Sequence, residues 1–152
     1  MEEKMRTYLE DIGIGSSIKK RVGEIYKFYK DICPEEVTRI FVTEYISEEG
    51  ARIYENLLFF SENYAMEAKD FLNKDDFDMT LLEDVTYWDI EKKNYDFETA
   101  TETSSFYLNI SLTNDRYCEF KASKNNCDYL KALFLECFLP KFEKSSVEDE
   151  KI

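Results

Sequence analysis

The sequence predicts an α+β fold in which about seven antiparallel strands follow a short helical section and end in one amphipathic helix. Three successive hydrophobic periods lead to this prediction. Apolar residues recur every three or four positions up to residue 33, alternate from residue 37 to about residue 123, and return to the helical spacing over residues 127–138. The 152 residues, 43% of them hydrophobic and 16% aromatic, predict one domain with a single core.

Residues 1–33 are expected to form one or two helices that pack on the same core as the strands. In the first helix, spacings of three, one and three place these side chains on one face: Met5, Tyr8, Leu9 and Ile12. In the second, spacings of four, three, four and three give a longer stripe: Ile18, Val22, Ile25, Tyr29 and Ile32. Gly13 and Gly15 are expected to stop the first helix. Ser16 or Ser17 is expected to cap the second, and Pro34 to end it.

The first three strands are expected within residues 37–46, 51–61 and 64–71. β-Branched and aromatic residues dominate these segments, and apolar side chains alternate along them. The short polar segments between them predict tight turns, so the first two strands are expected to form a hairpin.

Four further strands are expected before the last helix. The segments 77–81 and 85–90 alternate less clearly, and the threonine-rich segment 91–104 predicts a loop with some strand character. Residues 106–112 alternate most clearly, and residues 116–123 alternate after a turn, so this pair predicts an antiparallel hairpin.

The closing helix is predicted by one apolar stripe: Cys127, Leu130, Leu133, Phe134, Cys137 and Phe138. Asn125 or Asn126 is expected to cap this helix and Pro140 to stop it. Residues 143–152 have almost nothing to bury, which predicts a mobile acidic tail.

This order of elements over about residues 35–142 resembles the pleckstrin-homology superfold, which includes GRAM and bacterial PH-like domains. The resemblance implies that residues 34–142 form a seven-stranded split barrel closed by the C-terminal helix. The family's usual tryptophan is missing from that helix, since the single tryptophan is Trp88. Its basic phosphoinositide pattern is also missing, because Arg39 and Arg52 are isolated, so headgroup binding does not carry over. The resemblance then implies the binding of proteins or peptides.

Charge is unevenly distributed. Residues 1–33 contain 7 basic and 6 acidic residues, which leaves 13 basic against 27 acidic residues in the rest of a chain with net charge −13. Such a field repels nucleic acids and anionic lipid and favours a basic partner, although it also serves plain solubility. The N-terminal segment lacks the apolar stretch of a signal peptide, and no run is long enough to span a membrane, so a cytoplasmic setting is expected.

The sequence names no catalytic residue, no metal site and no cofactor. It has no histidine, and its four cysteines follow no zinc spacing and are expected to be buried as small apolar groups: Cys33, Cys118, Cys127 and Cys137. An EF-hand counted from Asp76 fails at Leu81 and Tyr87, so solvated turns are expected for the acidic cluster of Asp75, Asp76, Asp78, Glu83 and Asp84.

Two E-x-K triplets on predicted strands, residues 67–69 and 119–121, resemble the metal-binding triplet of restriction-type nucleases. Asp115 would supply the further acid for the second triplet. The alternative is that alternation places Glu and Lys together on a solvated face, and the acidic chain favours this alternative.

The leading hypothesis is therefore a non-enzymatic binding module for a protein or peptide, with no direct binding of nucleic acid or membrane. The alternative is an acidic inhibitor or immunity-type protein that masks a basic nuclease or nucleic-acid-binding surface, and a divalent-metal-dependent nuclease is the third. An exposed apolar stripe on residues 18–32 would point to a homodimer through the N-terminal helix. Several aromatic residues are expected either to pack under the N-terminal helices or to form a binding surface: Tyr45, Tyr54, Phe60, Tyr64 and Tyr87.

Overall fold

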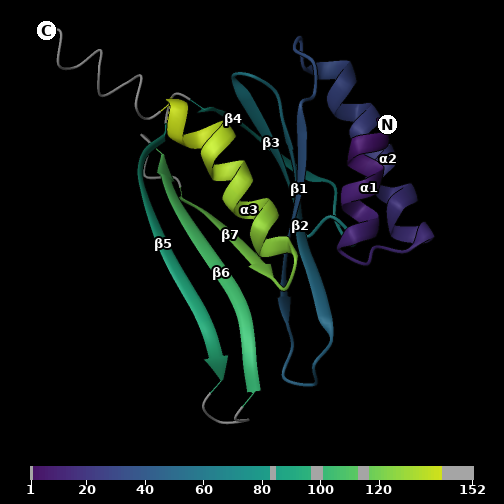
Figure 1. Ribbon diagram of the computed structural model, residues 1–152. Helices are drawn as coiled ribbons and strands as arrows, with labels where there is room; N and C mark the ends of the chain where they lie inside the picture. The colour runs from purple at the N-terminus through teal and green to yellow at the C-terminus, as the bar shows by residue number, and fades with distance from the viewer. Residues whose placement is uncertain (1, 83–84, 97–100, 113–116, 142–152) are drawn as a thin grey trace, which may run out of the picture. The chain divides into compact units, whose positions relative to one another are not determined.

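The computed structural model describes residues 2–82, 85–96, 101–112 and 117–141, with side chains described throughout these ranges except at 85–88, 90–96, 101–107, 111–112 and 117. The described chain is α+β, with two helices before the strands and one after them (Figure 1). The predicted mobile tail, 143–152, lies outside the described residues. The elements are α1 (Glu3–Asp11), α2 (Ser16–Ile32), β1 (Arg39–Ile46), β2 (Arg52–Phe60), β3 (Tyr64–Lys69), β4 (Asp76–Leu81), β5 (Val85–Asp96), β6 (Thr101–Leu112), β7 (Tyr117–Ser123), α3 (Asn126–Leu133) and the π-helix η2 (Phe134–Phe138).

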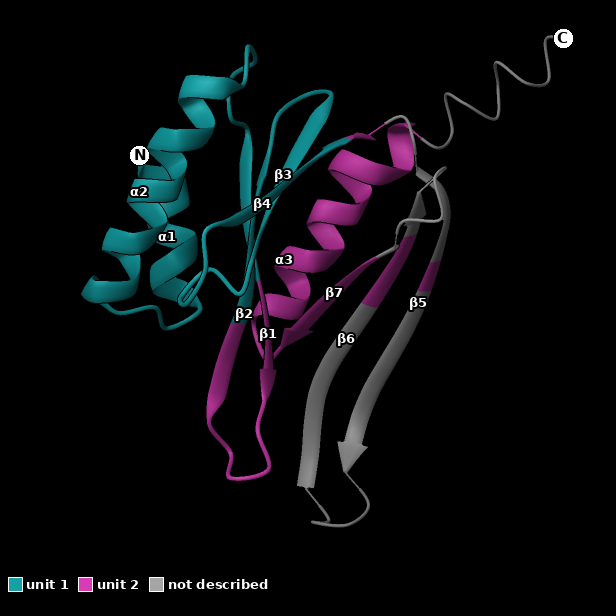
Figure 2. Ribbon diagram, turned by 180° about the vertical axis from the view of Figure 1, so that it is seen from behind, with its two compact units in different colours: residues 1–42, 55–80 teal, residues 43–54, 81–152 magenta. Residues whose placement is uncertain are grey.

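The chain divides into two compact units, which Figure 2 colours separately. Unit 1 comprises Met1–Val42 and Glu55–Thr80, and unit 2 comprises Thr43–Tyr54 and Leu81–Ile152. β1 and β2 each contribute residues to both units. The two N-terminal helices therefore share a unit with β3, whereas the turn end of the β1–β2 hairpin shares a unit with α3.

The helices of unit 1 form where the sequence predicts them. Gly13, at a φ of 85°, adopts the left-handed conformation that ends α1. The predicted serine cap of α2 is wrong, because Gly15 is the N-cap, Ser16 is already helical, and no side chain bonds to the helix end. A serine inside the first turn cannot accept the hydrogen bonds that an N-cap side chain accepts, so here the backbone of Gly15 begins the helix alone.

In unit 1 the helices pack on the strands through aromatic side chains. Tyr8 stacks on Phe41 of β1 with ring centroids 6.2 Å apart, and Tyr29 stacks on Phe59 of β2 at 5.7 Å. The stripe predicted on α2 is fully buried at its centre, but Ile32 at its end is 49% exposed. Burial of these rings removes large apolar areas from water.

β1 to β4 form a four-stranded sheet in chain order. β2 and β3 are antiparallel, with Leu58 opposite Glu67 and Phe60 opposite Ala65. Residues 57–60 of β2 are all buried, so both faces of the sheet are covered at this end. β4 is the last strand of this order and lies at an edge.

β5, β6 and β7 form a three-stranded antiparallel sheet within unit 2. Leu108 and Phe120 are opposite each other across β6 and β7, and both are buried. α3 packs on β6 and β7 (Figure 2). The Phe138 ring meets the Phe120 ring edge-on, with centroids 5.6 Å apart. The apolar stripe predicted for this helix therefore covers the three-stranded sheet.

The prediction of a seven-stranded split barrel closed by the C-terminal helix is wrong. The strands form two separate sheets, and among the described residues no ladder connects them into a closed barrel. Alternation along a strand shows which residues share a face, but it does not show which strand will pair with it, and closure depends on that pairing. The resemblance to the pleckstrin-homology superfold rested on this same count and order of strands.

The structure also corrects local predictions in two parts of the chain. Residues 91–96 and 101–104, expected as a loop, belong to β5 and β6, where Lys92 is opposite Phe106 and Asp96 is opposite Thr101. Pairing in a long hairpin offsets the low strand preference of the charged residues. At the C-terminal helix Asn125 is the N-cap, as predicted, but its side chain makes no capping hydrogen bond. The predicted stop at Pro140 is wrong, because the backbone stays helical to residue 141.

Candidate functional site

Unit 2 contains a fully buried carboxylate, that of Glu44. Glu44 lies in β1, where residues 40–44 are all buried, and its side chain is 0% exposed. A charged group in this environment destabilises the fold unless donors surround it. The surroundings of Glu44 therefore decide what this site can do.

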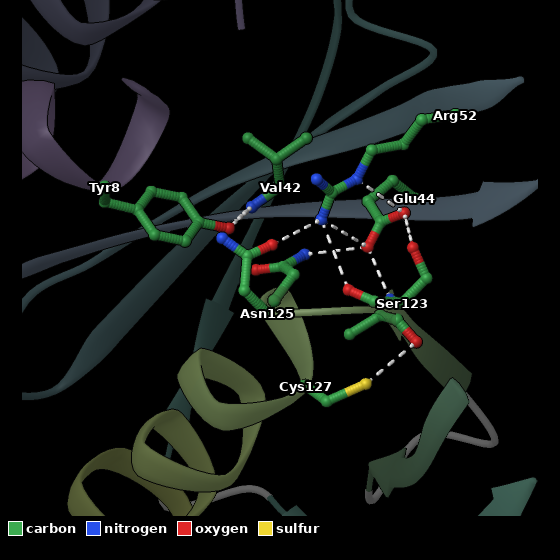
Figure 3. A network of polar contacts seen from close by, with 9 residues as sticks. Tyr8, Val42, Glu44, Arg52, Ser123, Asn125 and Cys127 are labelled. Atoms are coloured by element: carbon green, nitrogen blue, oxygen red, sulfur yellow. Dashed lines mark hydrogen bonds and ion pairs between the residues drawn. The ribbon is translucent and has the colours of Figure 1, made fainter. Parts of the chain in front are cut away.

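Glu44 has donors from three different elements (Figure 3). Oε1 accepts hydrogen bonds from the Ser123 N–H at 2.5 Å and from Asn126 Nδ2 at 3.2 Å. Oε2 accepts a hydrogen bond from Ser123 Oγ at 2.5 Å. Arg52 Nη2 donates to Oε1 at 3.3 Å, and Arg52 Nε lies 3.1 Å from Oε2 as an ion-pair contact whose N–H is not aligned with that oxygen. Both oxygens thus accept hydrogen bonds from protein donors.

Arg52 extends this network to the junction between β7 and α3. Its Nη2 also donates to the Ser123 carbonyl at 3.2 Å and to Asn125 Oδ1 at 3.4 Å. Between these residues Lys124 adopts a φ of 50°, a conformation that costs free energy for a residue with a side chain. The Glu44–Arg52 pair therefore holds a strained junction against the β1–β2 hairpin within the same unit.

The thiol of Cys127 lies directly beside this network. Cys127 is buried, and its Sγ donates to the Ala122 carbonyl at 3.5 Å. Burial raises the pKa of the Cys127 thiol, and the negative charge of Glu44 raises it further. A thiol with a raised pKa is a poor nucleophile at neutral pH, so Cys127 is suited to packing.

Unit 1 contains a second buried polar cluster, around Glu35. Glu35 Oε1 accepts from Ser61 Oγ at 2.9 Å and from the Asn63 N–H at 3.0 Å, and Oε2 accepts from Asn63 Nδ2 at 2.6 Å. Tyr29 donates its hydroxyl to Ser61 Oγ at 3.1 Å and accepts from Cys33 Sγ at 3.3 Å. Ser61 Oγ also lies 3.3 Å from the Tyr64 carbonyl, and the hydrogen bonds of this cluster end on the Glu35 carboxylate.

The Glu35 cluster connects the C-terminal end of α2 to the turn between β2 and β3. Tyr29 is fully buried and Ser61 nearly so, and burial raises the pKa of the Tyr29 hydroxyl well above its ordinary value. Catalysis by these groups would need a reacting atom within hydrogen-bond reach. Since the hydrogen-bond partners of Tyr29, Ser61 and Glu35 are groups of the protein itself, the geometry indicates that the cluster holds α2 to the β2–β3 turn.

The sequence alone missed both carboxylates, although one signal for Glu44 was present. Ile40, Val42 and Ile46 share one face of the first predicted strand, and Glu44 occupies the remaining position of that same face. A charge in an apolar series predicts a buried partner, here Arg52. The partners on β7 and α3 lie 79 and 82 positions away, and no local pattern points to them.

The two E-x-K triplets do not form metal sites in the described structure. Lys69 forms an ion pair with Asp78 at 2.7 Å, and this hydrogen bond is the main cause that raises the Lys69 pKa. Lys121 lies 3.4 Å from Glu119 of its own triplet, and both side chains are substantially exposed. Asp115, the further acid of the nuclease hypothesis, is outside the described residues.

The acidic cluster after β3 is likewise divided among ion pairs. Asp75 pairs with Arg21 at 2.7 Å and Asp78 with Lys69, while Glu83 and Asp84 are outside the described residues. Across the described ranges, no three carboxylate or thiol side chains gather as ligands for a metal ion. The geometry therefore indicates solvated ion pairs at this position.

Of the aromatic residues expected to pack or to form a surface, Phe60 is fully buried and Tyr54 and Tyr64 are half-buried. Tyr45 is exposed, and the Lys121 ammonium lies over its ring at 5.5 Å. The side chain of Tyr87 is outside the described set. Tyr45 and Tyr54 belong to unit 2, whereas Phe60 and Tyr64 belong to unit 1.

A different apolar surface is present on unit 1. The Phe28 ring of α2 packs against the Phe77 ring of β4, with centroids 5.0 Å apart and the rings tilted by 31°. Ile32 lies one helical turn beyond Phe28, and Met79 lies on the same face of β4 as Phe77. Phe28, Ile32 and Met79 are 43%, 49% and 39% exposed. We call these four residues the α2–β4 surface.

The described helices include none that is long and apolar enough to cross a membrane. Comparison of the chain with family models, curated proteins and solved structures finds no match.

Proposed function

We propose that this chain is a non-enzymatic binding module whose ligand is a protein or peptide. The observation that carries the proposal is the α2–β4 surface, where two aromatic rings, an isoleucine and a methionine are grouped on neighbouring elements and three of the side chains are substantially exposed. Aromatic residues and methionine are enriched in interfaces because they bury large areas and adapt to the shape of a partner. Grouped exposed apolar residues indicate an interaction site, whereas single ones do not.

The two carboxylate clusters support the non-enzymatic part of the proposal. Glu44 and Glu35 both accept hydrogen bonds at both oxygens from protein donors. A general base needs a lone pair directed at the substrate, and a nucleophilic or metal-binding carboxylate needs an open coordination position. These carboxylates are instead used in holding the fold.

Selection of a random peptide display library on the purified chain tests the proposal. Peptides selected on the wild type are expected to lose most of their binding to a Phe28→Ser/Met79→Ser double variant, because both substitutions remove exposed apolar area. Leu135→Ser is the matched control, since Leu135 is an equally apolar residue of unit 2 with 58% exposure. Peptides that bind the double variant as tightly as the wild type would overturn the proposal.

The second candidate is an acidic inhibitor that masks a basic nuclease or nucleic-acid-binding surface, and the net charge of −13 favours it. Complexes held mainly by charge weaken steeply with salt, whereas apolar interfaces do not. The dissociation constant of the best selected peptides, measured at several salt concentrations, distinguishes the two. A steep loss of affinity together with insensitivity to Phe28→Ser favours the inhibitor, and a shallow loss with sensitivity to Phe28→Ser favours the apolar surface.

A further inference from the structure

We infer that the ligand binds by strand addition at the outer edge of β4, as an extended segment in which apolar and basic residues alternate. This inference rests on the proposed function and specifies its ligand. It depends on three features of unit 1: the sheet edge, the two different faces of β4, and the contacts that hold the edge in place.

The sheet order leaves β4 with β3 on one side and, among the described residues, no strand on the other. Lys69 of β3 and Asp78 of β4 form the ion pair across the inner side. The main chain at the outer edge presents donors and acceptors that a further strand can use. Asp76 and Met79 of β4 are exposed, and none of the residues of this strand is buried.

The first face of β4 is apolar. Phe77 and Met79 alternate on this face, and Phe28 of α2 packs on Phe77. A strand added at the edge would place every second side chain beside Met79 and under the exposed part of α2, where Ile32 lies one turn beyond Phe28. Apolar side chains at these positions would bury surface that is otherwise in water.

The second face of β4 is acidic. Asp76 is exposed and the Asp78 side chain is 35% exposed, and both point away from the apolar face because residues along a strand alternate. Lys69 is the basic side chain paired with Asp78, and its pKa is raised further by the charge of Asp76. A basic residue of the ligand opposite Asp76 would add a favourable cross-strand pair. The alternation of the ligand thus follows from the alternation of β4.

The same charges argue against a second copy of this chain as the occupant. Pairing two copies edge to edge along β4 would bring the acidic faces of the two strands together, and like charges across strands are destabilising. Each copy also carries a net charge of −13. Charges on an edge strand commonly prevent such self-pairing.

Arg21 holds the entry to β4 in place. Its Nε donates to the Phe71 carbonyl, and its Nη2 donates to the Lys74 carbonyl and to Asp75 Oδ1, all at 2.7 Å. Three charge-assisted hydrogen bonds from one guanidinium fix the segment that leads into the strand. An edge that is already ordered loses less conformational entropy on binding.

The test uses a synthetic peptide of alternating valine and lysine, a composition-matched peptide with the order scrambled, and an alternating peptide with N-methyl groups on its main-chain amides. Binding is measured by fluorescence anisotropy on the intact chain. The alternating peptide is expected to bind at least tenfold more tightly than either control, because the first control loses the alternation and the second loses the main-chain donors.

The variant Asp76→Lys is expected to weaken binding of the alternating peptide about fivefold, in the range of a cross-strand charge pair that changes from attraction to repulsion. The control is Glu48→Lys, which changes an exposed acid of unit 2 and is expected to leave binding unchanged.

Equal binding of the alternating, scrambled and N-methylated peptides would overturn strand addition. Equal binding to the wild type and to Asp76→Lys would overturn the basic character of the ligand. Neither result affects the proposed function if library peptides still depend on Phe28 and Met79, so the failure of the inference and the failure of the proposed function remain distinguishable.

Discussion

Glu44 and Arg52 show at the residue scale how the fold accommodates a buried charge. Removal of one partner leaves the other charged and without its counter-charge in a site with little access to water, whereas loss of both is much less costly. The donors of Ser123 and Asn126 make the carboxylate at position 44 still more necessary, because their N–H groups are directed at its oxygen. We therefore expect the stability of unit 2 to depend strongly on this pair.

Glu44→Gln is expected to lower the free energy of unfolding by about 3 kcal/mol, the lower end of the range for breaking a buried pair. The matched control is Glu119→Gln, which breaks a solvent-exposed pair with Lys121 and is expected to cost less than about 1 kcal/mol. Urea unfolding followed by circular dichroism measures both. A loss below 1 kcal/mol for Glu44→Gln would show that the network contributes little to stability.

The Cys127 thiol predicts a pH dependence. Because burial and then Glu44 raise its pKa in the folded state, the folded chain keeps this proton at pH values where the unfolded chain has lost it. The free energy of unfolding therefore decreases as pH rises above the ordinary thiol pKa of about 8.5. Cys127→Ala removes this contribution, so urea unfolding from pH 7 to pH 10 is expected to give a shallower decrease for the variant. Parallel curves for the two proteins would contradict the assignment.

At the scale of single residues the sequence revealed the positions of the side chains better than their partners. The alternation of the first strand placed Glu44 on the apolar face, but it could not identify Ser123 or Asn126, which are distant in the sequence. The exposure of Phe28 agrees with its position outside the stripe that the helical spacing predicts for α2, but its packing on Phe77 of β4 could not be predicted. Such features depend on tertiary packing, and local patterns do not report it.

At the scale of elements, two glycines in different backbone conformations should respond oppositely to alanine. Gly23 lies inside α2, and an added Cβ would have no atom within 4 Å, so Gly23→Ala is expected to stabilise the chain by about 0.5–1 kcal/mol through helix propensity. Gly50, in the β1–β2 turn, has a φ of 86°. Gly50→Ala is expected to destabilise the chain by about 1 kcal/mol, since an L-residue is strained there even in open space. Thermal unfolding of both variants checks the two signs, and a shared sign would contradict the assigned conformations.

The sequence predicts elements well where one period extends over a long segment, as in α2 and in β6 and β7. The prediction fails where the structure of a segment depends on the other segment of the chain with which it pairs. The polar residues 91–96 are in a strand because β6 pairs with them. The π-helix η2, residues 134–138, interrupts a stripe whose spacing predicts a regular α-helix. A π-helix has one more residue per turn than an α-helix and is frequent at functional sites. A stripe of six apolar residues is too short to show this additional residue.

At the scale of the whole molecule, the number and order of the strands were predictable but their pairing was not. Seven segments with period two are compatible with one barrel or with two sheets, and the outcome depends on whether the edge strands of the two sheets pair with each other, as β4 with β5 and β1 with β7. No pattern inside either segment indicates that contact. The division of β1 and β2 between two compact units likewise depends on contacts between residues that are distant in the sequence.

The net charge of −13 also acts on the whole molecule, because the compact state brings like charges closer together than the unfolded chain does. Raising NaCl from about 0.02 M to about 0.5 M shortens the Debye length from roughly 20 Å to roughly 4 Å and screens this repulsion. We therefore expect salt to raise the free energy of unfolding by about 1 kcal/mol, or the melting temperature by about 3 °C for a chain of this size.

Charge variants on exposed side chains separate this effect from the general action of salt. A variant with Glu48, Glu49 and Glu62 all changed to Gln lowers the net negative charge and is expected to be more stable than the wild type at low salt and less sensitive to salt. A variant with Lys20 and Lys27 changed to Gln raises the negative charge and is expected to show the opposite changes. If repulsion limits stability, the salt sensitivity of the three proteins must follow their net charge. Equal salt sensitivity in all three would show that the excess of acids acts only on solubility and on the choice of a partner.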